Sequence, residues 1–172
     1  GVIGAFQVFA TAYVMTGGGP NNASRFYALY LFQTAFEQFK LGKAQMIREG
    51  RDVLMVTSGF MTMRALDAAE RLAKDGVDVA VLHNPTIKPL DRETILAEAR
   101  LGGRLVVTAE NHTIVGGLGE AVATTLLTNG VTPTFRMIGL PDEFLEAGAL
   151  PTLHDMYGIS VDGIVRQIKG WI

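Results

Sequence analysis

Short apolar runs alternate along most of the chain with stretches whose apolar residues recur at helical spacing. Residues 53–58 and 105–107 are rich in apolar and β-branched side chains, which predicts strands buried on both faces of a sheet. Residues 61–74 instead place alanine and leucine on one stripe, which predicts an amphipathic helix. Strands that alternate with such helices predict an α/β fold with a mostly parallel sheet covered on both faces.

The same pattern predicts the other elements between residues 43 and 168. We expect strands at residues 43–48, 53–58, 77–82, 105–107 and 132–138. We expect helices at residues 61–74, after an Asp91 N-cap, at 120–127, at 151–157, and at 161–168 with Ser160 as N-cap. The connections are short, so we predict one domain over residues 41–172.

The first 40 residues follow a different pattern. Residues 2–15 are almost wholly apolar, residues 17–22 form a loop of glycine, proline and asparagine, and residues 25–39 predict an aromatic-rich helix. The apolar run is shorter than the roughly 20 residues that a membrane-spanning helix needs. We therefore interpret residues 1–40 as an apolar helical segment that packs on another surface, and we expect no membrane span.

Composition removes several classes of function. The 172 residues include no cysteine, which excludes disulfides, thiolate metal sites and cysteine nucleophiles. A net charge of −2 and a pI near 5.9 argue against nucleic-acid binding. The three histidines, His83, His112 and His154, are too scattered along the sequence to indicate a metal site.

The candidate functional residues lie between residues 103 and 129. Glu110 and His112 follow the strand predicted at 105–107, and Gly116, Gly117 and Gly119 precede the next helix. Polar groups just beyond the carboxyl ends of parallel strands are where such folds usually meet ligands or partners. We therefore predict these five residues as a partner or ligand surface.

Each of these residues has more than one interpretation. The glycines suit a tight turn with close helix packing, or a phosphate at the helix start, although the GGxG spacing differs from G-x-G-x-x-G. Glu110 either pairs with a neighbouring subunit or caps a turn. His112 either makes a structural hydrogen bond, faces a partner domain, or acts in acid–base or phosphate contacts.

Two family resemblances divide the chain. The phrases GAFQVFATAYVMTGGGPNNAS and YLFQTAFEQFKLGKAQ, within residues 1–45, resemble the permease subunits of sugar ABC transporters, but the coupling motif and complete spans of that family are absent. From residue 41 onward, EGRDVLMVTSGF, TIKPLD, AENHTIVGGLGEAVA and IGLPDEFLEAGALPTLHDMYGIS are similar, in order, to the C-terminal domain of transketolases. Because KLGKAQ suits both families, we hypothesise a chimera joined near residues 41–45.

The transketolase resemblance implies a three-layer α/β/α domain with a five-stranded sheet whose first strand is an antiparallel edge. It also implies that thiamine diphosphate and magnesium are bound by a pyrophosphate and a pyrimidine domain that precede this domain in the family. Neither of these two domains is recognisable in this sequence, so no cofactor is expected in this chain.

Three functions remain open at this point. In the first, the chain is a cytoplasmic C-terminal domain that packs on a pyrimidine domain and supports a dimer, either with itself or with a thiamine-diphosphate-binding partner subunit, without catalysis of its own. In the second, it is a small module that binds a phosphorylated effector at residues 116–120. In the third, residues 1–40 make it a membrane-associated fragment.

Overall fold

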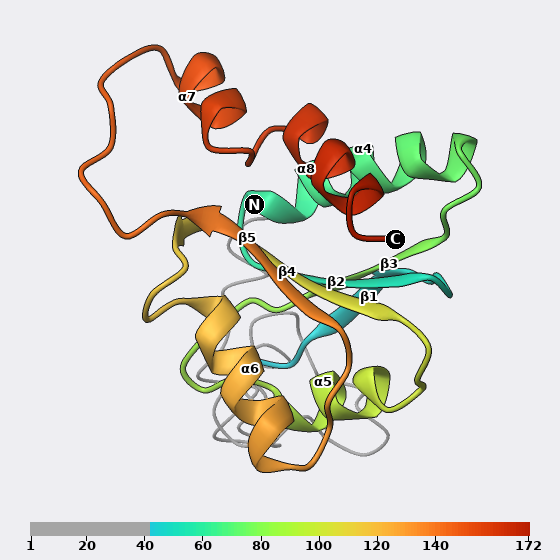
Figure 1. Ribbon diagram of the computed structural model, residues 1–172. Coiled ribbons are helices and arrows are strands. Elements are labelled where there is room, and N and C mark those ends of the chain that lie inside the picture. The colour runs from blue at the N-terminus through green and yellow to red at the C-terminus, as the bar shows by residue number, and fades with distance from the viewer. Residues whose placement is uncertain (1–41) are drawn as a thin grey trace, which may run out of the picture. The chain divides into compact units, whose positions relative to one another are not determined.

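The computed structural model describes residues 42–172 (Figure 1). The predictions made for residues 1–40, including the permease resemblance and the domain boundary, lie outside this part and stay predictions. Among residues 42–172, no helix combines the length and the apolar character that crossing a bilayer requires. The elements, in chain order, are β1 (Gln45–Arg48), β2 (Val53–Thr57), α4 (Met61–Lys74), β3 (Val79–His83), α5 (Arg92–Ala99), β4 (Leu105–Thr113), α6 (Leu118–Thr128), β5 (Phe135–Leu140), α7 (Leu150–Met156) and α8 (Val161–Lys169).

The five strands form one sheet in the order β1-β3-β2-β4-β5. β1 runs antiparallel to β3, and the other neighbours are parallel, so that Val53 of β2 lies opposite Val79 of β3 and Leu105 of β4. Both the mostly parallel sheet and its antiparallel first edge are confirmed. The carboxyl ends of β2, β3, β4 and β5 therefore meet at one edge of the sheet.

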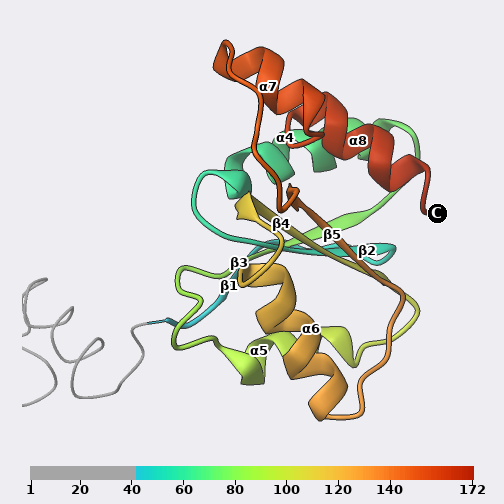
Figure 2. The ribbon, with the colours of Figure 1, turned by 60° about the vertical axis from the view of Figure 1, so that its left-hand side comes forward.

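Helices cover both faces of the sheet, which makes the predicted three layers (Figures 1 and 2). The helices α4, α7 and α8 lie on one side, and α5 and α6 lie on the other. Successive residues of β2 face opposite layers: Val53 and Met55 pack with α4 and α8, whereas Leu54 and Val56 pack with α5 and α6. The central strand is thus buried on both faces, as its apolar sequence predicts.

Two helix starts show how local sequence fixes the fold. The Asp91 carboxylate caps α5 by accepting the backbone N–H of Thr94 at 3.1 Å, and it also accepts the N–H of Ala44, which precedes β1, at 2.8 Å. Burial raises the pKa of Asp91, but the hydrogen bonds from Thr94 and Ala44 outweigh it and hold that pKa below its ordinary value. Ser160 caps α8 through the N–H of Gly163 at 3.0 Å.

Some predicted strand bounds are wrong. β4 does not end at residue 107 but continues to Thr113, because β5 runs on to Leu140 and pairs with it beyond a register shift. The N–H of Ile114 also donates to the carbonyl of Leu140 at 2.9 Å. Polar side chains at residues 110–113 made this extension look like a loop. Likewise, β3 and β5 begin later than predicted, at Val79 and Phe135.

Candidate functional site at the carboxyl end of β4

The Glu110 side chain is the buried centre of the predicted surface. It is only 1% exposed, and its two carboxylate oxygens accept the backbone N–H groups of Leu118 at 2.7 Å and Gly119 at 2.8 Å. The first amides of a helix have no partner within the helix, and the positive end of the helix dipole attracts an anion. Glu110 therefore caps α6 from the neighbouring strand, which matches the capping interpretation within this chain.

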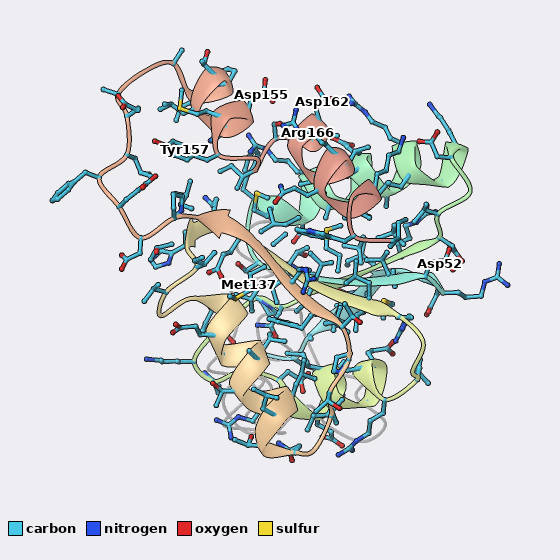
Figure 3. All side chains as sticks on the ribbon, in the orientation of Figure 1. Asp52, Met137, Asp155, Tyr157, Asp162 and Arg166 are labelled. Atoms are coloured by element: carbon cyan, nitrogen blue, oxygen red, sulfur yellow. The ribbon has the colours of Figure 1, made fainter. Side chains whose placement is uncertain are left out.

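The glycines before α6 make room for this cap. A Cβ atom on Gly117 would overlap the Glu110 carboxylate and lie 2.7 Å from the Thr113 carbonyl oxygen. Gly116 has a φ of +72°, which a side chain would strain. A Cβ on Gly119 would overlap the side chain of Met137, which extends from β5 toward α6 (Figure 3). The three glycines thus provide a tight turn and close helix packing.

His112 lies apart from this buried arrangement. Its side chain is exposed, and its Nδ1 lies 3.0 Å from the carbonyl oxygen of Thr113, to which it donates. Val115, in the turn that follows, is 47% exposed. The structure therefore brings Glu110, Gly117 and Gly119 together in the interior and leaves His112 and Val115 on the surface.

A buried hydroxyl cluster at the ends of β2 and β3 was missed by sequence reasoning. The Thr57 hydroxyl lies 2.9 Å from the Thr62 hydroxyl, which lies 2.8 Å from Nδ1 of His83. Thr57 also donates to the carbonyl of Leu82 at 3.4 Å. These contacts attach both strand ends to α4. The only sequence signal was that Thr57 and His83 end adjacent apolar runs.

A groove runs beside the glycine turn, between residues 87–92 and the first half of α6. Lys88 and Arg92 line it on one side, and Gly116 and Glu120 line it on the other. The N–H of Gly116 donates to the Glu120 carboxylate at 2.7 Å. An anion at this helix start would therefore compete with carboxylates that already accept the amides of Gly116, Leu118 and Gly119.

The family match decides the identity of this fold. The family model described as "Transketolase, C-terminal domain" matches residues 42–164. The chain belongs to the transketolase C-terminal domain family. The match begins where the described residues begin, and the permease resemblance of the opening residues finds no support in it.

Relatives of the family place the domain within longer proteins. The chain is 68% identical over 136 residues to the transketolase family protein y4mN of Sinorhizobium fredii, covering 78% of this chain and 39% of that protein. It is 43% identical over 130 residues to a 6-deoxy-6-sulfo-D-fructose transketolase subunit of a Clostridium species, covering 76% and 40%. A 1-deoxy-D-xylulose-5-phosphate synthase of Desulforudis audaxviator is 42% identical over 130 residues, covering 75% of this chain and 20% of the synthase.

A solved structure shares both the fold and the sequence. It is described as a split gene transketolase in an inactive β4 tetramer, and it is 36% identical with a TM-score of 0.67. The match covers 74% of this chain and 41% of that chain. The chain thus spans about two fifths or less of the length of these relatives, and the transketolase fold is established for the matched part.

Proposed function

We propose that this chain serves as the C-terminal domain of a cytoplasmic, transketolase-like, thiamine-diphosphate-dependent enzyme. Its role is to pack on a pyrimidine domain and to support the dimer, with itself or with a partner subunit, without catalysis of its own. The observation that carries the proposal is the continuous family match over residues 42–164. It is supported by a transketolase subunit of which the chain covers only 40%.

The cofactor of the family has no matching donors in the described domain. Within residues 42–172, no group of three or more His, Asp or Glu side chains is close enough to hold a metal ion. The amides of the glycine turn, the obvious place for a diphosphate, already bind Glu110 and Glu120. In this proposal, as in the family that the chain resembles, other domains hold thiamine diphosphate and magnesium, and no reaction step is assigned to this domain.

The partner surface lies at the carboxyl end of β4 and includes His112, Val115 and Gly116, which are exposed. Val115 offers an exposed apolar contact, and His112 offers an imidazole whose Nδ1 is engaged by Thr113. Both residues contact Thr113, because the Val115 N–H donates to its hydroxyl at 3.3 Å and the His112 ring donates to its carbonyl. A surface that is already ordered before binding loses little conformational entropy in the complex.

Co-purification tests the proposal directly. The tagged chain is isolated from its source cell, and we expect a subunit that binds thiamine diphosphate to accompany it. V115D should weaken that association at least about tenfold, because a charge at an interface centre is costly to desolvate. L127D is the matched control, since Leu127 is also an exposed apolar residue but lies near the C-terminal end of α6, away from the turn that carries Val115.

Two results would contradict the proposal. One is ketol transfer by the isolated chain when it is supplied with thiamine diphosphate and magnesium. The other is equal loss of the partner in V115D and L127D. The mass of the purified chain, measured by light scattering, separates a self-dimer from a complex with another subunit.

The groove beside the glycine turn keeps a second function open. Lys88 and Arg92 line it, and cations suit a phosphorylated effector. Against this, the neighbouring amides are already bound by carboxylates, so we expect no thermal shift with inorganic phosphate or sugar phosphates. A clear shift that K88A and R92A abolish would favour the effector module instead.

A further inference from the structure

Residues 141–157 form an arm that is weakly attached to the domain. The arm contains α7, which contributes no buried residue, and it exposes Phe144, Leu150 and Met156. Figures 1 and 2 show it leaving the end of β5 and carrying α7 out past the sheet, on the side of α4 and α8. The backbone N–H of Glu146 donates to the Tyr157 hydroxyl at 2.8 Å, which closes the arm on itself, and Figure 3 shows Tyr157 on the side of that loop.

The arm is tied to α4 by one guanidinium. Nη2 of Arg64 lies 2.6 Å from Nδ1 of His154, and Nη1 donates to the Ile159 carbonyl at 2.6 Å. The guanidinium also lies over the Phe60 ring, 4.5 Å from its centroid. Arginine can only donate, so Nδ1 of His154 must accept. The contact therefore requires a neutral imidazole with its proton on Nε2.

Protonation of His154 would turn this contact into a repulsion. A second N–H would point at Arg64, and two positive charges would lie in direct contact. Arg64 is held in place by Ile159 and Phe60, so relief requires movement of His154 and the helix that carries it. Partial burial and then the charge of Arg64 lower the pKa of His154, while Asp155 raises it. Partial burial lowers the pKa of Arg64 too, and Asp155 opposes that, but its guanidinium stays charged.

Backbone hydrogen bonds join the arm to the rest of the domain at its end, where the His154 carbonyl accepts the N–H groups of Ile159 at 2.9 Å and Ser160 at 3.0 Å, so the arm would pivot about this end. Of the nearby carboxylates, Asp155 is on α7 and would move with His154, and Asp162 on α8 is paired with Arg71. Helix α8 is fixed by buried Ile164 and by its contacts with α4. Gly158, with a φ of +70°, separates the two helices, and Gln167 donates to its carbonyl at 2.8 Å. The chain is therefore firmly packed again from α8 onward, directly after the arm.

We propose that Arg64 and His154 form a proton-sensitive clasp that holds the arm on α4 at neutral pH and releases it at acid pH. A histidine whose pKa is lower in the closed state than its ordinary value of about 6.5 favours closure above that pH. This stabilisation of the closed arm is lost as the pH falls from about 6.5 through the pKa of His154 in the closed state. Each unit of difference between the two pKa values corresponds to a tenfold change in the opening equilibrium.

Hydrogen exchange on the full chain tests the clasp. Exchange is measured by mass spectrometry at about pH 7.5 and about pH 5.5, on either side of the ordinary histidine pKa, and corrected for intrinsic rates. We expect protection in residues 141–157 to fall several-fold at the lower pH, while α8 and the sheet keep theirs. Unchanged protection of the arm would overturn the proposal, and loss of protection everywhere would show global acid unfolding instead.

Three variants separate the clasp from general acid effects. H154Q keeps an amide oxygen that can accept from Arg64 but does not titrate, so its arm should stay equally protected at both pH values. R64M removes the donor, and its arm should be open at both. H112Q removes a histidine elsewhere and should respond as the wild type does. An acid response in H154Q equal to that of the wild type would refute the role of His154.

Discussion

Helices α6 and α7 both follow strands at the carboxyl edge of the sheet, but they are attached in opposite ways. The first amides of α6 bind the buried Glu110 carboxylate, and α6 buries Leu118, Val122 and Leu126. Helix α7 buries no residue and is held by Arg64, by its own loop and by the N–H groups of Ile159 and Ser160, which donate to the His154 carbonyl. A buried carboxylate makes α6 part of the core, whereas a partly buried contact between a guanidinium and an imidazole leaves α7 adjustable.

The difference shows that hydrogen-bond length does not measure how firmly an element is held. The contacts of Glu110 and of Arg64 are about equally short. What differs is the cost of breaking them. Opening the Glu110 contacts leaves a buried carboxylate and buried amides without partners. Opening the contact between Arg64 and His154 instead lets the guanidinium and the imidazole form hydrogen bonds with water.

The largest effect is expected for E110A. Removal of the carboxylate leaves the amides of Leu118 and Gly119 unpaired at a buried helix start. We expect a loss of about 3 kcal/mol in the free energy of unfolding, measured by urea denaturation. E120A is the matched control, because Glu120 also accepts a turn amide but is exposed, and it should cost less than about 1 kcal/mol. Equal losses in the two variants would remove the distinction between buried and exposed caps.

G117A should be the next most damaging change. Its Cβ would overlap the Glu110 carboxylate, which cannot move without breaking the cap, and it would also press on the Thr113 backbone. We expect a loss of about 2 kcal/mol. G119A should cost less, about 1 kcal/mol, because the atoms it meets first belong to the flexible, partly exposed side chain of Met137. The reverse order in thermal or urea unfolding would contradict this account.

D91A probes a cap of intermediate burial at the start of α5. We expect a loss of about 1 kcal/mol at neutral pH, because the amides of Thr94 and Ala44 lose their acceptor. The pKa of Asp91 is lower in the folded state, so its contribution is present above the unfolded value of about 3.9 and disappears as the pH falls through the folded value. The stability curves of wild type and D91A should therefore converge in acid, and parallel curves would be inconsistent with this cap.

The smallest effect on global stability is expected for R64Q. Because the arm opens without exposing core residues, the free energy of unfolding measured by urea denaturation should change by less than about 1 kcal/mol. The change should appear instead as faster exchange confined to residues 141–157. A loss comparable to that of E110A would mean that α7 belongs to the core after all.

The sequence predicted the architecture because each element carries its own periodicity. The buried stripe of α4, including Ala65, Ala69 and Leu72, is readable from spacing alone, and both bounds of that helix were right. The end of β4 was not readable, because Glu110 looks like a surface residue until its partner amides on α6 are known. Burial of a charged side chain depends on contacts that no local pattern records.

The candidate site was predictable only in part. The glycine turn and the capping interpretation of Glu110 came from residues within ten positions of one another. The Thr62–His83 and Arg64–His154 contacts join residues 21 and 90 positions apart, so they exist only in the folded chain. Whether His112 and its neighbours meet a partner stays a prediction, because it concerns a complex.

The Glu110 carboxylate occupies the position that a side chain on Gly117 would take. Substitutions at these two positions should therefore depend on each other. A shorter acidic residue at position 110 would open room for a methyl group at 117, so E110D with G117A should be tolerated better than the sum of the separate changes. Lineages that alter one of these residues should therefore tend to alter the other, although six residues and the end of β4 lie between them.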